Sequence, residues 1–514
     1  MTRSRIRAYV PCYDMRRKKQ LWSVGTRRSY ARHRRLFKKH KNSKTPESRQ
    51  AWLKSSSELR RSRRKDRFDA ENSVLTAAND GVFWRFVRTK LRSNSVIPCL
   101  VNNGEKLFDP KDKVELFNRF FVSVFVPDDG IFLDFAHLAA SSLSNVDFSP
   151  NVVLSHLAQL KGKFSAGFDG IPQYFLKKLA FAVSTPLSII FSTSFVLGQL
   201  PSAWKIAKIT PVHKKSNKSL VSNYRPISLL PACSKLMERI ICSELKEYLI
   251  ANDLISKAQH GFLSNRSTVT QLISCLDDWT MAVDSGNCVD VIYMDVSKAF
   301  DTVPHSKLIQ KLHSFGIGGN LLRWITDYLK DRKQAVFLDG CSSSLVNVDS
   351  GVPQGSILGP ILFLVYLNDL ESVVQSGKIS LYADDSKLYW TFSSDMLDPT
   401  AMQADLAAIS SWCNTMQLRL AVDKCCVLHL GFHNPNFQYT LNGRPLNSVS
   451  HMRDLGVTIR NDLKWFSHCD NLVSSAFRSV NLIFKVFVTR NRKFLLRLFF
   501  TYVRLYLFYF SDVW

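Results

Sequence analysis

Two segments of the chain carry aspartates in a setting that can support chemistry. In the first, a β-branched run over residues 289–294 leads to Asp295, which places this carboxylate at the carboxyl end of a buried strand. In the second, apolar strand-forming residues flank Asp384 and Asp385 on both sides, as at the tip of a hairpin. Neighbouring residues on a straight strand face opposite ways, so consecutive carboxylates converge only where the backbone turns. A hairpin tip permits this, and Asp295 is available from an adjacent strand.

A cluster of three carboxylates is a site for hard cations. The carboxylates raise one another's pKa values unless such ions neutralise them, so Mg²⁺ is the expected ligand, with Mn²⁺ as a substitute. Two ions about 3.5 to 4 Å apart lower the pKa of an attacking hydroxyl and stabilise a leaving pyrophosphate, as in nucleotidyl transfer. A bare Asp-Asp pair more often caps a surface turn. The wider sequence therefore has to decide.

The elements around these aspartates indicate a mixed fold. From about residue 151 onward, helices and short strands alternate, with turns near 167–172 and 223–226. Apolar spacing predicts one helix over 304–315 and another over 114–125. This alternation favours an α/β or α+β fold over a helical bundle.

The charge of the chain is positive and unevenly distributed. The 514 residues contain 69 Lys and Arg against 42 Asp and Glu, a formal net charge of +27, with 46% hydrophobic residues. Such an apolar composition excludes a disordered chain. Residues 1–70 hold 24 of the basic residues and only 5 of the acidic ones. Clusters of this density contact phosphate or serve in nuclear import more often than they form a neutral solvated face, so we predict a nucleic-acid-binding arm over 1–70.

Cysteine usage and hydropathy indicate an intracellular protein. The 11 cysteines are odd in number and include no CxxC pair, which argues against a disulfide framework and a zinc ribbon. The longest apolar runs, 357–367 and 494–510, are shorter than a membrane span or interrupted by arginines. No signal peptide is recognisable at the start. We therefore expect no membrane partner and no secretion.

One cysteine- and histidine-rich segment could suggest a zinc site. It contains Cys425, Cys426, His429 and His433. Adjacent cysteines do not easily share a tetrahedral site with both histidines, and the alternation is typical of a half-buried strand. We therefore predict a core strand here.

Four blocks in one order and spacing resemble the reverse transcriptase of non-LTR retrotransposons of the jockey or CR1-like group. They are NYRPISLL at 223–230, DVSKAFD at 295–301, GVPQGSILGPILFLVYLNDL at 351–370 and YADD at 382–385. The resemblance covers about residues 165–470 and extends to AGFDGIP at 166–172, QHGFLSNRST at 259–268, LAVDKCCVLHLG at 420–431 and DLGVTI at 454–459.

This resemblance implies an α+β right-hand polymerase with fingers, palm and a partial thumb, preceded by a basic, largely helical region. The implied domains are the arm at 1–70, a helical connecting region at 71–150, fingers and palm at 151–470, and the start of a thumb at 471–514. The last segment ends inside an apolar stretch, and we expect it to be truncated.

The same resemblance assigns the aspartates and one aromatic residue. Asp295, Asp384 and Asp385 would bind two Mg²⁺ ions and be catalytic. Phe300 lies where the family places a ring against the sugar of the incoming nucleotide, leaving no room for a 2′-hydroxyl. It would therefore favour DNA synthesis; the alternative is a core phenylalanine of the following helix.

Four polar residues match family positions around the nucleotide. Gln354 belongs to the loop whose small neighbours let the backbone approach the substrate. Arg225 and Lys214 match the finger residues that grip the triphosphate. Lys424 matches a lysine near the leaving group, where it could act as a general acid, although Ala421 and Val422 depart from the family pattern beside it. Its alternative is a solvated lysine at the end of a strand.

The implied activity is RNA-directed DNA synthesis. The enzyme would extend the 3′-hydroxyl of a DNA primer with dNTPs on an RNA template, in the nucleus and cytoplasm, with an endonuclease supplied by a separate polypeptide. Two alternatives stay open: an inactive nucleic-acid-binding remnant of a truncated element, and an RNA-dependent RNA polymerase. Phe300 disfavours the second.

Overall fold

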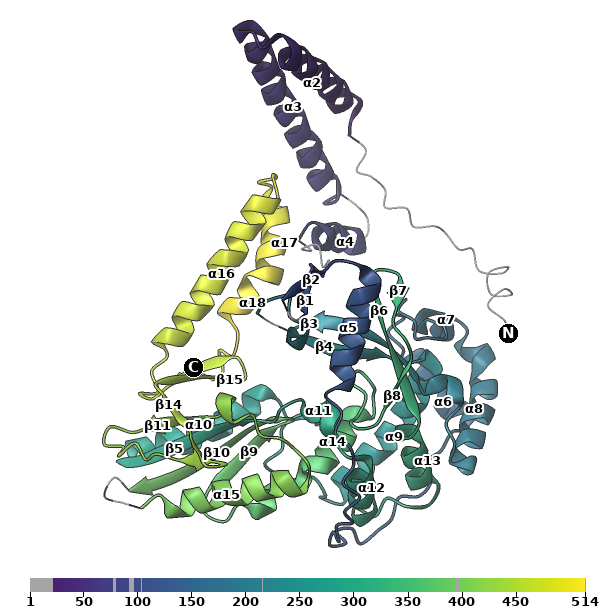
Figure 1. The fold of residues 1–514 in the computed structure, drawn as a ribbon, viewed down its shortest axis with the longest axis vertical. Coiled ribbons are helices and arrows are strands. Elements are labelled where there is room, and N and C mark those ends of the chain that lie inside the picture. Colours follow the sequence, from purple (N-terminus) through teal and green to yellow (C-terminus); the bar gives the residue numbers. More distant parts are fainter. Residues whose placement is uncertain are drawn as a thin grey trace. The chain divides into compact units, whose positions relative to one another are not determined.

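A computed structural model describes residues 22–76, 80–91, 97–102, 104–214, 216–393, 395 and 398–513 (Figure 1). These residues fall into two compact units. Unit 1 lies within Met1–Ser95 and Cys469–Ser511, and unit 2 within Val96–His468 and Asp512–Trp514. Both sheets described below belong to unit 2, and the chain is a mixture of helices and sheets, as the sequence predicts.

The first five-stranded sheet, here called the carboxylate sheet, contains all the aspartates singled out above or their immediate flanks. Its central strand β5 is buried along nearly its whole length, which explains its continuous apolar run. Strand β5 is antiparallel to β10 and β11, whereas β11 and β14 are parallel. The strand order is β14 (Asn447–Val449), β11 (Cys426–Leu430), β5 (Asn287–Asp295), β10 (Asp385–Ser393) and β9 (Lys378–Tyr382).

The second five-stranded sheet, here called the cation sheet, carries Arg225 on one strand and ends beside Lys214. Helix α5 packs on it through Phe117 and Phe121, which join Tyr224 in one hydrophobic cluster. Its strands are β4 (Tyr224–Leu229), β3 (Ile206–His213), β6 (Arg332–Leu338) and β7 (Cys341–Ser342), with β8 (Val346–Val348) paired to β6.

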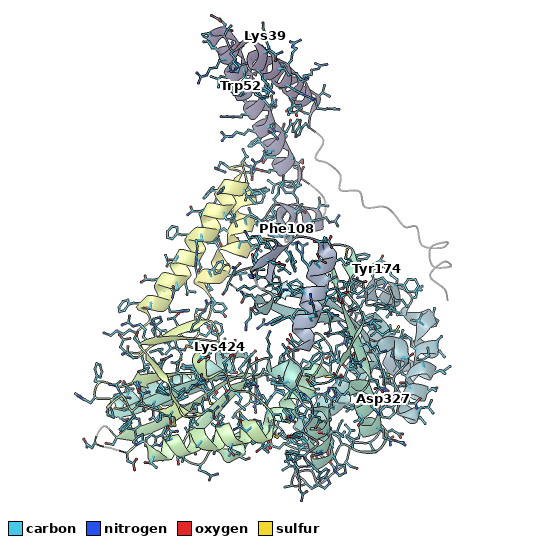
Figure 2. All side chains as sticks on the ribbon, in the orientation of Figure 1. Lys39, Trp52, Phe108, Tyr174, Asp327 and Lys424 are labelled. Atoms are coloured by element: carbon cyan, nitrogen blue, oxygen red, sulfur yellow. The ribbon has the colours of Figure 1, made fainter. Side chains whose placement is uncertain are left out.

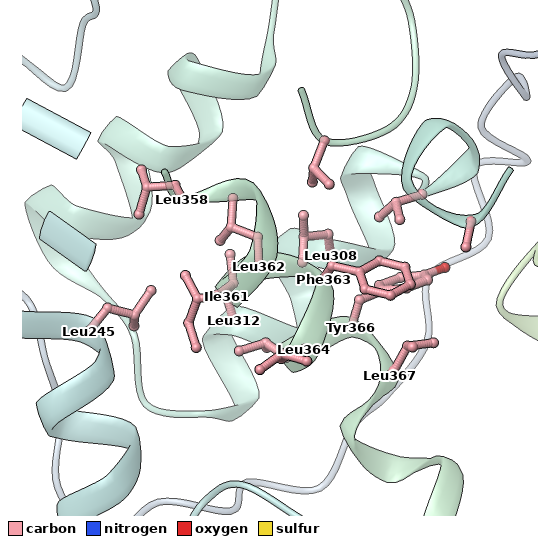
Figure 3. Close-up of a cluster of buried hydrophobic side chains, with 14 of the residues drawn as sticks. Leu245, Leu308, Leu312, Leu358, Ile361, Leu362, Phe363, Leu364, Tyr366 and Leu367 are labelled. Carbon is pink, nitrogen blue, oxygen red and sulfur yellow. The ribbon is translucent and has the colours of Figure 1, made fainter. Parts of the chain in front are cut away.

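The main hydrophobic core of unit 2 surrounds helix α14 (Gly359–Leu367), whose residues from Ile361 to Leu367 are all buried (Figure 3). Full burial of each such side chain contributes roughly 1.5 to 3 kcal/mol. The helices of unit 2 are α5 (Pro110–Val122), α6 (Pro150–Ala158), α7 (Gln173–Lys178), α8 (Ala180–Leu197), α9 (Ala232–Ala251), α10 (Thr268–Asp284), α11 (Ala299–Thr302), α12 (His305–Ser314), α13 (Gly319–Leu329), α14 and α15 (Thr400–Thr415). Helices α5 and α12 match the two predicted helices.

Helix α8 is long and apolar enough to cross a membrane by length and composition. The sequence scan missed it because serines and threonines interrupt its apolar run. One face places Leu187, Phe191 and Phe195 in the main core, as in the core helix of a globular domain. The helix is thus only weak evidence for a membrane span.

Unit 1 joins the two ends of the described chain. Helices α2 and α3 form an antiparallel hairpin in which Trp52 stacks on His40 (Figure 2). Near the end of α3, the Glu71 carboxylate accepts hydrogen bonds from the backbone N–H groups of Val488 and Thr489 at 2.8 and 2.7 Å. The helices are α2 (Val24–Ser43), α3 (Pro46–Ser73), α4 (Asp80–Leu91), α16 (Phe466–Val486), α17 (Arg492–Tyr502) and α18 (Arg504–Leu507).

This arrangement divides the predicted connecting region 71–150. Helix α4 belongs to unit 1, whereas the hairpin of β1 (Leu100–Asn102) and β2 (Glu105–Leu107) and helix α5 belong to unit 2. Helix α4 contributes Phe83, whose ring meets Phe494 of α17 at 5.3 Å. The region is therefore neither wholly helical nor one body.

Three short strand pairs complete unit 2, of which the last borders the candidate site. Strands β15 and β16 form their own antiparallel hairpin, joined by Leu455 and Gly456, which both have positive φ. The remaining strand bounds are β12 (Thr440–Leu441), β13 (Arg444–Pro445), β15 (His451–Asp454) and β16 (Val457–Arg460).

Candidate active site

The structure brings the predicted aspartates to one end of the carboxylate sheet. Strands β9 and β10 form the predicted hairpin, with Tyr382 opposite Asp385 and a two-residue turn of Ala383 and Asp384. Ala383 has a φ of 57°, a conformation that closes such tight turns. In the neighbouring pair, Asp385 lies directly opposite Asp295, and side chains so placed have Cβ atoms about 4.5 to 5.5 Å apart. The predicted placement of Asp295 on an adjacent strand is confirmed.

A buried glutamine holds this turn in place. The Gln259 side-chain oxygen accepts hydrogen bonds from the backbone N–H groups of Ala383 at 2.9 Å and Gly261 at 2.7 Å. A Cβ on Gly261 would lie 2.5 Å from the Ala383 nitrogen, so only glycine permits this approach. Gln259 was not predicted as a site residue, although the sequence QHGF that contains it was noted.

The carboxylates have raised pKa values. Burial raises the pKa of Asp385 to about 6, and the charges of Asp384 and Asp295 add to that effect. Burial also raises the pKa of Asp384, with a further contribution from Asp295, while Arg225 and Lys214 oppose it. Mutual repulsion of this kind favours a bound cation.

Lys424 lies against the first of these aspartates. Its ammonium is 2.5 Å from an Asp295 carboxylate oxygen, and the lysine side chain is otherwise largely exposed (Figure 2). Backbone contacts explain the placement, because the N–H of Ala421 donates to the carbonyl of Asp295 and the N–H of Lys424 to that of Ala421, both at 2.8 Å. Despite the atypical local sequence, Lys424 therefore reaches the site.

The donor set fits the hard, oxygen-preferring chemistry of Mg²⁺. Asp295 and Asp385 face each other in register, and their excess negative charge is the property that a divalent ion would neutralise. In the part of the chain that the structure describes, however, no three His, Cys, Asp or Glu side chains are yet grouped closely enough to hold an ion. Around Asp295, the ammonium of Lys424 supplies the neighbouring positive charge instead.

The loop containing Gln354 is fixed against the cation sheet. The Gln354 carbonyl accepts a 2.7 Å hydrogen bond from the N–H of Ser228 on β4, and its side-chain amide donates to Asp301 at 2.8 Å. Gly355 has a φ of 107°, and a Cβ there would lie 2.8 Å from the Ser228 carbonyl oxygen. The backbone of this loop is thus preorganised, and Asp301 orients Gln354.

Phe300 lies beside the same loop. Its carbonyl accepts a hydrogen bond from the N–H of Val352 at 2.8 Å. Its ring is half-buried and stacks on Phe363 of α14 with the centroids 4.3 Å apart. The ring thus contacts the core, as the alternative interpretation expects, while remaining partly exposed at the site.

Cations approach the aspartates from several elements. Arg225 and Lys214 are both exposed near one end of the cation sheet, and their charges reach Asp384. Lys298 is a further member that the sequence analysis did not identify. It has a φ of 53°, and its pKa is lowered by burial and by the nearby charges of Lys214, Lys424 and Arg225.

The predicted core strand near His429 is confirmed. Strand β11 is buried along its whole length, and His429 contacts Asp290 at 2.7 Å. Asp290 also accepts hydrogen bonds from Asn434 and from the Tyr439 hydroxyl, at 2.9 and 2.6 Å. These side chains form a buried polar network beneath the sheet.

Comparison with known proteins matches this architecture to one family. The profile of the family "Reverse transcriptase (RNA-dependent DNA polymerase)" matches residues 212–490, more than half of the chain. The chain is 29% identical over 334 residues to the RNA-directed DNA polymerase from mobile element jockey of Drosophila melanogaster, covering 63% of this chain and 36% of that protein. It is 27% identical to a probable RNA-directed DNA polymerase from transposon BS of the same species, covering 62% and 36%.

A further relative is a probable RNA-directed DNA polymerase from the Drosophila melanogaster transposon X-element, 30% identical over 46% of this chain and 27% of that protein. The chain spans about a third of the length of the curated relatives it matches. The resemblance read from the motifs is confirmed: the chain belongs to the reverse transcriptase family, as a jockey/CR1-like member.

Proposed function

We propose that this chain is the polymerase part of a non-LTR retroelement protein and extends a DNA primer on an RNA template with dNTPs. The observation that carries the proposal is the pairing of Asp295 with Asp385 across two strands, with Asp384 at the adjoining turn. The carboxylate sheet then corresponds to the palm and the cation sheet to the fingers. Helices α16 and α17 correspond to the start of the thumb.

In this proposal the chain's own residues bind and orient the reactants. Asp295, Asp384 and Asp385 would hold two Mg²⁺ ions, which when bound lower the pKa of the primer 3′-hydroxyl and neutralise charge on the leaving pyrophosphate. Arg225 and Lys214 bind the triphosphate, for which a guanidinium fork and an ammonium are suited.

The remaining residues act on the sugar and on the leaving group. Phe300 excludes a 2′-hydroxyl, and Gln354, held by Asp301, contacts the deoxyribose. Lys424 moves from Asp295 toward the leaving pyrophosphate, where it donates a proton. Its flexible side chain and exposed position allow this displacement.

Primer extension tests the proposed activity. The purified chain should extend a DNA primer on an RNA template with dNTPs and Mg²⁺, and Asp384→Ala should abolish the product. A preference for rNTPs would support an RNA-dependent RNA polymerase instead. Salt-sensitive RNA binding without any product would support the inactive remnant. A separate nicking enzyme would then be needed to supply the primer end in the cell.

The basic arm supports nucleic-acid binding. Residues 24–73, which span α2 and α3, contain 17 Lys and Arg against 5 Asp and Glu. A pocket of about 520 Å³ in unit 1 is lined by Arg60, Arg63, Arg64, Arg67, Lys485 and Arg490 together with Phe484, Phe487 and Val488. Guanidinium groups suit phosphate oxygens, and an exposed aromatic ring suits an unstacked base.

Salt-dependent RNA binding tests this arm. The double variant Arg60→Gln, Arg64→Gln should weaken binding and reduce the slope of log K against log salt by about 1 to 2. Lys177→Gln, Lys178→Gln on α7 is the matched control, since it removes two exposed cations elsewhere. Equal effects of the two double variants would contradict a specific role for the arm. Nuclear and cytoplasmic localisation is part of the same proposal, and a fusion lacking residues 1–70 should lose nuclear accumulation.

A further inference from the structure

A buried ion pair lies next to the aspartates without belonging to them. The Lys387 ammonium is 2.5 Å from an Asp454 carboxylate oxygen, and only 3% and 7% of the two side chains are exposed. Lys387 lies on β10, two residues after Asp385, and Asp454 is the last residue of β15. None of the roles described above uses either residue.

The pair occupies the layer below the catalytic carboxylates. Residues two apart on a strand point to the same face, so Lys387 projects from β10 on the same side as Asp385. The register repeats this relation on β5, where Tyr293 is opposite Lys387 as Asp295 is opposite Asp385. The ammonium also lies 5.7 Å from the centre of the Trp279 ring.

The ion pair connects two separate sheets. The β15–β16 hairpin forms its own two-stranded sheet, and Lys387 belongs to the carboxylate sheet. A buried ion pair adds little net stability compared with apolar residues of similar size, but losing one partner costs about 3 to 5 kcal/mol. Such a pair is therefore suited to fixing a position more than to adding stability.

A pocket of about 360 Å³ lies between the hairpin and the aspartates. Asp295, Asp385 and Lys424 line one part of it, whereas the hairpin contributes Met452, Arg453, Asp454 and Leu455. Phe300, Gln354 and Arg225, which are assigned to the incoming nucleotide, are not among its lining residues. Nucleotidyl transfer needs a second reactant at the same carboxylates, and this pocket has the size of a small-ligand site.

We propose that Lys387 and Asp454 are positioning residues that hold the β15–β16 hairpin at a fixed height over the pocket and thereby position the 3′-terminal nucleotide of the primer. Arg453, at the pocket, supplies a cation for the primer phosphate. This inference rests on the proposed polymerase function and deepens it.

Steady-state primer extension with separate titrations of primer–template and dNTP tests the role. Lys387→Met removes the ammonium at similar length, and Asp454→Asn keeps an oxygen for Lys387 with a smaller perturbation. We expect the KM for primer–template to rise at least tenfold in Lys387→Met and less in Asp454→Asn, with the KM for dNTP unchanged. The double variant Lys387→Asp, Asp454→Lys restores the pair with reversed charges and should recover part of the loss.

The matched control is Lys307→Met. Lys307 is also buried, with 1% of its side chain exposed, and pairs with Asp129 at 2.6 Å away from the pocket. Both methionine variants should lose stability, but only Lys387→Met should change the KM for primer–template. A change confined to the amount of active protein, equal in both variants, would overturn the proposal.

A binding measurement separates this proposal from the polymerase function. A primer with 2-aminopurine at its 3′ end, annealed to RNA, reports the environment of the terminal base without turnover. Wild-type protein should change its fluorescence, and Lys387→Met should lose that change while still binding the duplex. If wild-type protein extends no primer but gives this pattern, positioning holds and the proposed function fails. If wild-type protein leaves the terminal base unaffected, the positioning role is wrong.

Discussion

The two five-stranded sheets of unit 2 contribute opposite charges to the candidate site, and they do so by different means. Asp384 and Asp385 are placed by strand register and by a turn that buried Gln259 holds. Arg225 and Lys214 are exposed, near one end of the cation sheet. A carboxylate on a short side chain can be no better placed than its backbone, whereas long basic side chains adapt. Substitutions should therefore affect the carboxylate side through the rate and the cation side through substrate affinity.

The strongest way to break this comparison without touching a carboxylate is Gln259→Leu. It removes the acceptor of the Ala383 and Gly261 N–H groups, and each buried donor left unsatisfied costs about 1 to 3 kcal/mol. If about 2 to 3 kcal/mol of this appears in the barrier, the extension rate falls roughly 30- to 150-fold, with the KM for dNTP unchanged. Stopped-flow extension measures both parameters.

The control for Gln259 is Gln310→Leu. Gln310 also accepts a backbone hydrogen bond, from the N–H of Leu133 at 2.8 Å, but it lies outside the site. An equal loss of rate in both variants would mean that Gln259 acts through stability alone.

Phe300→Val tests whether the ring selects the sugar. Shortening the side chain should lower the preference for dNTPs over rNTPs by about 10- to 100-fold. Competition between dNTP and rNTP on one template measures the ratio. Phe363→Leu perturbs the ring on which Phe300 stacks and should destabilise the core with a smaller effect on selectivity. An unchanged ratio in Phe300→Val would leave Phe300 as a core residue.

Arg225→Lys sharpens the contrast on the cation side. The variant retains the charge but loses the planar fork that binds two phosphate oxygens, so the KM for dNTP should rise about tenfold, or about 1.4 kcal/mol, with little change in maximal rate. Steady-state titration of dNTP measures the effect. A large fall in maximal rate with an unchanged KM would show that the two sheets do not differ in this way.

Asp301 gives the smallest effect, through pH-dependent stability. Burial raises its pKa to about 6 from 3.8, so the folded state binds this proton more tightly than the unfolded state. Its contribution to stability is therefore full below about pH 4 and is lost as pH rises through 6. Two pKa units correspond to at most about 3 kcal/mol.

Asp301→Asn should accordingly reduce the fall in the free energy of unfolding between pH 4 and 7, measured by urea denaturation without divalent ions. Part of the fall should remain, because the pKa of Asp385 is also raised to about 6. Asp423→Asn, at an exposed site, should leave the pH dependence unchanged. The same dependence in Asp301→Asn and wild-type protein would contradict the assignment.

The sequence predicted the parts of the site that depend on local pattern. Apolar strand-forming residues on both sides of Asp384 and Asp385 indicated the hairpin, and the β-branched run indicated β5. Gln259 was missed because an amide in a loop has no distinctive pattern, and its partner Ala383 is 124 residues away. Lys298 was missed because its approach to the site depends on a positive φ.

The larger-scale organisation was harder to predict. The contacts of Glu71 join residues 417 and 418 positions apart, and nothing in the local sequence around α3 indicates that partner. Helix α8 escaped the search because serines and threonines divide its apolar residues. In each case long-range packing, which local periodicity does not encode, decided the outcome.

Single-turnover primer extension by Asp385→Asn tests the central claim most directly. The substitution removes one negative charge at nearly constant size, and we expect the rate to fall at least about 1,000-fold, or about 4 kcal/mol. Asp278→Asn is the matched control, because Asp278 contacts Lys378 and the Tyr389 hydroxyl of the same sheet at 3.0 and 2.7 Å but is not among the clustered aspartates. Near wild-type extension by Asp278→Asn with none by Asp385→Asn would support the account. Comparable extension by both variants would contradict it.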